Sequence, residues 1–196
     1  METASCTCAT ATCSTHRRLV RSMTTWVLFA GLPGTGKSTL ARALAGRLDA
    51  AILDKDRVRG ALFPGVLTDY SSKQDQLCLR AMLDAAAYLT ERRRVSFIFF
   101  DGRTFSTRAQ REEVLLAAEQ AGAQSRILLV TCADAVAEER LAAGDPAHPA
   151  QNRDPALYRT IKQHFEPIQN AKLEVDTTLG MDEVLAAVEA YLKSRE

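Results

Sequence analysis

Residues 31–41 read GLPGTGKSTLA, and this short segment constrains the fold more than any other part of the chain. It holds three glycines and a proline, which interrupt both helices and strands. It nevertheless follows WVLFA (26–30), an apolar run typical of a buried strand, and continues into good helix formers. The segment is therefore predicted to form a turn between a strand and a helix, in which backbone groups rather than side chains make the important contacts.

A helix that starts directly after a strand leaves its first N–H groups without partners, and the helix dipole adds positive character there. Glycines let further N–H groups turn toward the same point, which creates a nest for phosphate oxygens. The spacing Gly31-x-x-x-x-Gly36-Lys37-Ser38 matches a phosphate loop at every fixed position. We therefore expect the loop to bind ATP through Gly31, Gly34, Thr35, Gly36, Lys37, Ser38 and Thr39.

Three side chains of this loop have distinct expected roles. Lys37 is predicted to reach the β- and γ-phosphates, where its charge also assists catalysis. Ser38 is predicted to be a ligand of Mg²⁺. Thr39 either contacts the α-phosphate or packs against the protein.

Short apolar runs alternate with helical patterns along the rest of the chain. The other predicted strands are 51–53, 95–100, 126–131 and 173–176. The predicted helices are 37–48, 71–93, 107–121, 134–143, 155–169 and 181–194. This alternation indicates βαβ units and hence an α/β fold with a parallel sheet between layers of helices. Ser106 is a candidate N-cap, Gly122 a candidate C′ residue, and Asp154-Pro155 a candidate N-cap followed by proline at the first helical position.

The length and composition suit one globular domain. Of 196 residues, 46% are apolar and 25% charged, and the net charge of +1 requires neither nucleic acid nor a membrane surface as partner. No apolar run approaches the roughly 20 residues of a membrane helix. We expect a single domain over 23–196, while residues 1–22 form a disordered tail or reflect a start placed upstream of Met23.

The chain has five cysteines, an odd and unevenly spread number. Such a distribution does not suit a disulfide framework and favours a reducing, cytoplasmic environment. Cys6, Cys8 and Cys13 lie close together near His16, but their spacing is not that of a zinc site.

A second group of polar residues follows the strand at 51–53. Ligands of open parallel sheets sit beyond the carboxyl ends of the strands, so Asp54 and Asp56 should lie near the phosphate loop. If Asp56 opens a helix, Arg59 shares its face. The carboxylate of Asp56 can accept the proton of an acceptor hydroxyl while Arg59 holds an anionic group. A helix N-cap is the alternative role for Asp56, and either aspartate could be the base.

A third group follows the strand at 95–100. Asp101 occupies the Walker B position, where a carboxylate orients Mg²⁺ through water or orients the attacking group. A turn-capping carboxylate is the alternative. Arg103 and Thr104 are candidate acceptor contacts, and so, less strongly, are two arginines of the following helix, Arg108 and Arg111.

The segment 144–154 (GDPAHPAQNRD) is the most interrupted stretch after the tail, and we expect it to be a lid. Small kinases close a loop over the phosphates to exclude water. Arg140 precedes this segment and Arg153 lies in it, so both are predicted to bind nucleotide phosphates. Arg140 is further predicted to stabilise charge during transfer.

The segments GLPGTGKSTLARAL, LDKDRVRGALF, FFDGRTFSTRAQR and NRDPALY together resemble the small P-loop kinases grouped as AAA-type ATP-binding proteins. This family includes polynucleotide 5′-hydroxyl kinases, adenylylsulfate kinases, gluconate kinases and zeta-toxin-like kinases, and the similarity covers residues 25–194. It implies a five-stranded parallel sheet in the order 2-3-1-4-5. In the polynucleotide kinases, Asp-x-x-Arg supplies a base and a phosphate-binding arginine, which correspond here to Asp56 and Arg59. Asp101-Gly102-Arg103-Thr104 departs from both the Ile-Ser-Pro of adenylylsulfate kinases and the Asn-Thr-Asn-like turn of polynucleotide kinases.

Three functional hypotheses follow. The favoured one is an ATP- and Mg²⁺-dependent kinase that phosphorylates a hydroxyl of a small molecule, acting as a monomer or homodimer. A polynucleotide 5′-hydroxyl kinase is less favoured, because the charge is near neutral and the chain lacks basic residues interleaved with aromatics. A regulatory P-loop ATPase without an acceptor is the third.

Overall fold

The computed structural model describes residues 23–144, 150 and 153–194. The predicted tail, with Cys6, Cys8 and Cys13, and most of the predicted lid lie outside these residues. The strands are β1 (Thr25–Ala30), β2 (Ala50–Asp54), β3 (Phe97–Asp101), β4 (Gln124–Thr131) and β5 (Leu173–Asp176). The helices are α1 (Lys37–Ala45), α2 (Lys55–Leu62), the 3-10 turn η1 (Gly65–Leu67), α3 (Ser72–Glu91), α4 (Arg108–Gln120), α5 (Asp134–Ala143), α6 (Pro155–Gln163) and α7 (Met181–Lys193).

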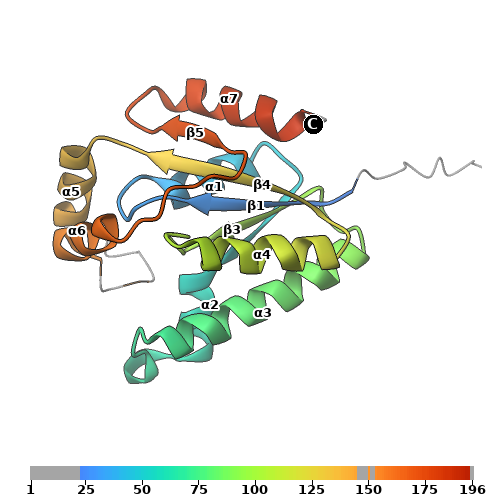
Figure 1. The fold of residues 1–196 in the computed structure, drawn as a ribbon, viewed down its shortest axis with the longest axis horizontal. Coiled ribbons are helices and arrows are strands. Elements are labelled where there is room, and N and C mark those ends of the chain that lie inside the picture. Colours follow the sequence, from blue (N-terminus) through green and yellow to red (C-terminus); the bar gives the residue numbers. More distant parts are fainter. Residues whose placement is uncertain (1–22, 145–149, 151–152, 195–196) are drawn as a thin grey trace, which may run out of the picture.

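The five strands form one sheet in the order β2-β3-β1-β4-β5, and all neighbouring pairs are parallel. This order confirms the predicted α/β P-loop fold. In Figure 1 the strands point toward the side of the molecule where α5 and α6 lie, and α7 and the α3–α4 pair flank opposite faces of the sheet. The carboxyl edge of the sheet is therefore the edge near α5 and α6.

The central strand β1 is fully buried and contributes alternate residues to two cores. Trp26 and Leu28 pack with residues of α3 and α4, such as Met82 and Val114. Val27 and Phe29 pack on the opposite face with residues of α1 and α7. A strand covered on both faces must be apolar at every position, which explains the uninterrupted WVLFA run.

Several predicted helix boundaries are wrong. The helix predicted over 37–48 ends at Ala45, and the helix predicted over 71–93 spans Ser72–Glu91. The helix predicted over 155–169 ends at Gln163. Pro167 has no N–H for a helical hydrogen bond, and its carbonyl instead accepts a hydrogen bond from Arg111. The N-cap of α4 is Thr107 rather than Ser106, and its hydroxyl accepts the N–H of Gln110 at 3.3 Å. In contrast, Asp154 caps α6 and Gly122 follows α4 in a left-handed conformation, both as predicted.

None of the helices among the described residues combines the length and apolarity needed to cross a lipid bilayer. Both cysteines in this part of the chain, Cys78 and Cys132, are free thiols.

Candidate functional site: a phosphate-loop cavity

A cavity of about 760 Å³ opens at the carboxyl edge of the sheet. It lies between the loop after β1, the start of α2, the end of β3, and helices α5 and α6. The predicted site residues that line it are Gly34, Gly36, Lys37, Ser38, Thr39, Asp56, Arg59, Asp101, Arg140 and Arg153. Gly31 and Thr35 belong to the same loop but are buried and do not line the cavity. The Gly31 N–H donates to Thr104 O, and the Thr35 hydroxyl donates to Leu32 O.

The loop after β1 has backbone geometry that only glycine adopts readily. Gly31 has φ +140°, and a Cβ there would lie 2.2 Å from the carbonyl oxygen of Val130. Gly36, at φ +88°, occupies the N-cap position of α1. Since glycine has no side chain, the first amides of α1 remain uncapped beside the cavity. Uncapped amides at a helix N-terminus are the donors that phosphate oxygens need.

Lys37 is buried in the loop, and its Nζ donates to the carbonyl oxygens of Gly31 at 2.9 Å and Leu32 at 2.6 Å. Burial lowers the pKa of Lys37 to about 8, an effect that the nearby charge of Arg153 reinforces and that of Asp101 opposes. A phosphate group in the cavity would add negative charge beside this ammonium and so raise its pKa again.

Asp101 ends β3, is buried, and lines the cavity. Within the described residues its Oδ1 is enclosed but has no hydrogen-bond partner. Ser38 lines the same cavity. The described ranges contain no group of three or more His, Cys, Asp or Glu residues that could hold a metal ion. One hydroxyl and one carboxylate fit Mg²⁺, which prefers oxygen ligands and keeps most of its coordination for water and substrate phosphates.

The two aspartates after β2 have different surroundings. Asp54 is the N-cap of α2, and its Oδ1 accepts the N–H groups of Asp56 at 2.9 Å and Arg57 at 3.3 Å. Gly102 packs tightly on this cap, because a Cβ at Gly102 would lie 2.7 Å from the same Oδ1. The alternative role for Asp56 as N-cap is therefore wrong, and Asp56 instead lines the cavity from the first turn of α2.

Arg59 lies one turn along α2 and is buried. It donates to Asp56 Oδ1 at 3.1 Å and also pairs with Asp75 of α3. Its guanidinium lies 5.1 Å from the ring centre of Tyr70, which has a left-handed backbone. This geometry holds Arg59 and Asp56 together on one face, as the i, i+3 spacing predicted.

Sequence reasoning missed three residues around this pair: Lys55, Tyr70 and Asp75 all line the cavity. Lys55 Nζ pairs with Asp75 at 3.0 Å, and burial lowers the pKa of Lys55 to about 8. Lys55 follows directly on β2, so the carboxyl-edge rule could have identified it. Asp75 carries no such signal, because it lies within the first turn of a long helix.

Arg140 of α5 lies against the phosphate loop. Its guanidinium donates to Gly34 O at 3.4 Å, Thr177 Oγ1 at 3.1 Å and Thr177 O at 3.4 Å. Thr177 follows β5, and its hydroxyl contacts Thr35 O at 2.8 Å. Thr177 was also missed, although its position after a strand at the carboxyl edge was a usable signal. Arg153 lines the cavity from the start of the α6 region.

The candidate acceptor contacts after β3 divide into two pairs. Arg103 and Thr104 line the cavity. Arg108 is exposed and pairs with Glu112 on α4. Arg111 is buried and donates to the carbonyl oxygens of Phe105 and Pro167, so it ties the start of α4 to the segment after α6. The expectation that Arg108 and Arg111 contact the acceptor is therefore not supported by their positions.

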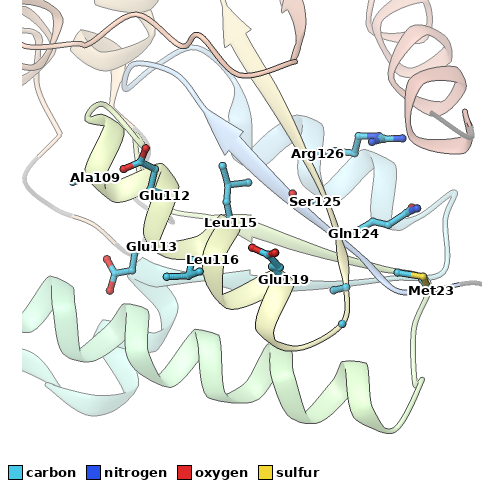
Figure 2. Close-up of a pocket in the computed structure, with 12 residues that line it drawn as sticks. Met23, Ala109, Glu112, Glu113, Leu115, Leu116, Glu119, Gln124, Ser125 and Arg126 are labelled. Atoms are coloured by element: carbon cyan, nitrogen blue, oxygen red, sulfur yellow. The ribbon is translucent and has the colours of Figure 1, made fainter.

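A larger hollow of about 1020 Å³ lies elsewhere, between α4 and the start of β4 (Figure 2). Its lining includes Met23 and the acidic residues Glu112, Glu113 and Glu119. None of the predicted site residues lines it, and three carboxylates oppose a phosphate ligand. The phosphate-loop cavity is therefore the better candidate site despite its smaller volume.

Comparison with known proteins gives a family match and several structural matches. The family model described as an AAA domain matches residues 27–168. No curated protein matches the chain in a sequence search. A protein from Chloroflexus aurantiacus has a similar structure with a TM-score of 0.69 at 22% identity, over 89% of this chain and 98% of that one.

Two further solved structures carry names of enzymes. The APS kinase of Mycobacterium tuberculosis in complex with AMPPNP and APS has a TM-score of 0.66 at 20% identity, over 88% of this chain and 99% of that one. A gluconokinase from Sinorhizobium meliloti has a TM-score of 0.59 at 15% identity, over 88% of this chain and 93% of that one. At these identities the likeness shows the fold alone.

Proposed function

Because the chain belongs to the AAA domain family, whose model matches residues 27–168, we propose that it is an ATP-dependent kinase that phosphorylates a hydroxyl of a small molecule. The observation that carries this proposal is that Lys37, Asp56 and Asp101 line one cavity, although they come from three different segments. The APS kinase and gluconokinase with the same fold support the reaction class.

In this proposal the loop from Gly31 to Thr39 holds the triphosphate with its uncapped amides. Lys37 donates to the β- and γ-phosphates and stabilises the charge that grows during transfer. Ser38 and Asp101 would hold Mg²⁺, which would neutralise phosphate charge when bound. Arg140 and Arg153 add positive charge on the side of α5 and α6.

Asp56 is the proposed base. The acceptor hydroxyl oxygen forms a bond to the γ-phosphorus as the bond from that phosphorus to the β,γ-bridging oxygen breaks. The hydroxyl proton passes to the Asp56 carboxylate, and ADP leaves with the bridging oxygen. Arg59 positions this carboxylate through the hydrogen bond at 3.1 Å. Asp54 is unsuited to the role because its Oδ1 already accepts two backbone N–H groups.

The proposal is tested by incubating the protein with γ-labelled ATP, Mg²⁺ and separate acceptors: sugars, sugar acids, nucleosides, aminoglycosides and 5′-hydroxyl oligonucleotides. We expect label transfer to a small-molecule hydroxyl. Transfer only to oligonucleotides would replace the proposal with a polynucleotide kinase. Slow ATP hydrolysis with no labelled acceptor across the panel would replace it with a regulatory ATPase.

A further inference from the structure

The part of the cavity beyond Asp56 carries an excess of positive charge. Its cations are Lys55, Arg59 and Arg103, whereas its carboxylates are Asp56 and Asp75. The two carboxylates are engaged with Lys55 and Arg59 through hydrogen-bonded ion pairs. Arg103 forms no ion pair among the described residues, so the local charge excess resides there.

Arg103 leaves β3 immediately after Asp101 and Gly102, and its side chain faces the same cavity as Asp56. Its Nη1 is buried and has no hydrogen-bond partner within the part of the chain that the structure describes. Burial lowers the pKa of Arg103, and only the charge of Glu113 is found to oppose this shift. Arginine stays charged even so, and burying a guanidinium without a counter-charge is costly unless a ligand supplies one.

Two more enclosed polar atoms at this cavity lack partners within the described residues. The Nε of Arg59 is a donor, and the side-chain oxygen of Gln110 is an acceptor. With Arg103 Nη1, the cavity therefore has two donors on cationic side chains and one neutral acceptor. Buried polar groups are nearly always satisfied, so these three atoms, in addition to the Asp101 Oδ1 assigned to the metal, indicate the hydrogen-bonding pattern of the missing ligand.

We propose that the phosphate acceptor is a small hydroxylated anion, whose carboxylate, phosphate or sulfate group is bound by Arg103 while one of its hydroxyls donates to Gln110. That the bound anion is the phosphate acceptor rests on the proposed kinase function. The anion site itself rests only on the charge and the unpartnered atoms of the cavity. A guanidinium suits this role because its fork can bind two oxygens of one anion at once.

The first test isolates the anion site. The protein is saturated with AMPPNP and Mg²⁺ to fill the phosphate loop, and sulfate is then titrated at constant ionic strength, with binding measured by calorimetry. We expect saturable binding that Arg103→Gln weakens at least tenfold. Arg57→Gln is the matched control, because Arg57 is an exposed arginine on α2 outside the cavity lining. Equal sulfate affinity in Arg103→Gln and the parent, or no saturable binding in the parent, overturns the anion site.

A second measurement covers the case in which Arg103→Gln does not fold. Arg103→Lys keeps the charge but loses the fork, so we expect weaker sulfate binding and an unchanged affinity for AMPPNP. An unchanged sulfate affinity in Arg103→Lys together with an unchanged acceptor KM contradicts recognition by the guanidinium.

Matched acceptor pairs then identify the anionic group and separate the two proposals. The pairs are an aldose with its aldonate, an aldose with its 6-phosphate, and a nucleoside with its monophosphate. We expect the anionic member of one pair to be phosphorylated, with a KM that Arg103→Gln raises at least tenfold. Phosphorylation of neutral members with no change in Arg103→Gln overturns the anionic acceptor and leaves the kinase standing. Loss of sulfate binding in Arg103→Gln with no acceptor phosphorylated supports the anion site and contradicts the kinase.

Discussion

Asp54 and Asp101 are register partners at the ends of β2 and β3, yet their Oδ1 atoms differ in whether they accept a hydrogen bond. Asp54 Oδ1 accepts two backbone N–H groups of α2. Asp101 Oδ1 is enclosed without a partner among the described residues. The first carboxylate therefore serves the fold, whereas the second is available to a ligand.

Asp101→Asn should weaken the Mg²⁺-dependent part of nucleotide binding by about 10- to 100-fold, the usual effect of losing a group that orients a metal. Its free energy of unfolding should not fall, because the change removes a buried charge that lacks a hydrogen bond at Oδ1. AMPPNP affinity is measured with and without Mg²⁺, and stability by urea unfolding. Unchanged Mg²⁺ dependence would contradict the role of Asp101 at the metal.

Asp54→Ala should lower the free energy of unfolding by about 1 kcal/mol, because α2 loses its N-cap. Asp54→Asn is the matched control, since asparagine caps helices as well as aspartate does, and it should retain most of the stability. Urea midpoints of both variants test this. If the two variants were equally destabilised, the negative charge of Asp54 rather than its cap would be what matters.

The assignment of Asp54 to the cap shows where sequence reasoning reached its limit. The alternation of strands and helices along the chain followed from apolar periodicity, and the phosphate loop from a motif between a strand and a helix. The order of the strands within the sheet came from the family resemblance. The sequence Asp54-Lys55-Asp56 permits a helix start at either aspartate, and only the observed start at Lys55 resolves the choice. The position of Thr177 at the carboxyl edge could have been predicted, but not its hydrogen bond to Thr35, which lies 142 positions away in the sequence.

Because of Lys37, nucleotide binding should be coupled to the uptake of a proton. Its pKa of about 8 in the free protein is below that of an unfolded chain, so the unfolded state binds more protons between about pH 8 and 10.5. The contribution of Lys37 to the free energy of unfolding therefore rises with pH across that window. Well below pH 8 this contribution does not change with pH, because both states are protonated. Phosphates beside Lys37 should raise its pKa again, so binding at pH 8.5 should take up a proton that is already bound at pH 7.

Calorimetry of AMPPNP binding in buffers of different ionisation enthalpy measures this uptake. We expect an uptake of about three quarters of a proton at pH 8.5 and about one tenth at pH 7, because Lys37 with a pKa of about 8 is already partly protonated at pH 8.5 and almost fully at pH 7. Lys37→Arg, which stays charged, should abolish the difference. Lys55→Arg is the control for the other lysine whose pKa is lowered to about 8, and it should retain the uptake because Lys55 contacts Asp75 rather than the phosphate loop. Uptake that survives in Lys37→Arg and disappears in Lys55→Arg would reverse this assignment.

Thr177→Val should weaken AMPPNP binding by about fivefold, roughly the value of one hydrogen bond, because Thr177 links Thr35 to Arg140 behind the loop. Thr178→Val is the matched control, since the Thr178 hydroxyl donates to Asp176 and has no contact with the loop. Affinities are compared at one Mg²⁺ concentration. Equal effects of the two substitutions would mean that the link does not support nucleotide binding.

Asp56→Asn provides the most direct test of the proposed chemistry. Asparagine keeps the size of the side chain and can still accept a hydrogen bond from Arg59, but it cannot take up the acceptor proton. We expect phosphoryl transfer to fall by about 10²- to 10⁴-fold, the usual contribution of a general base, while AMPPNP affinity stays within about twofold. Single-turnover rates with labelled ATP and the identified acceptor measure the first quantity, and calorimetry the second. A variant that transfers phosphate at the parent rate would remove Asp56 from the mechanism, because no change in positioning could restore its lost basicity.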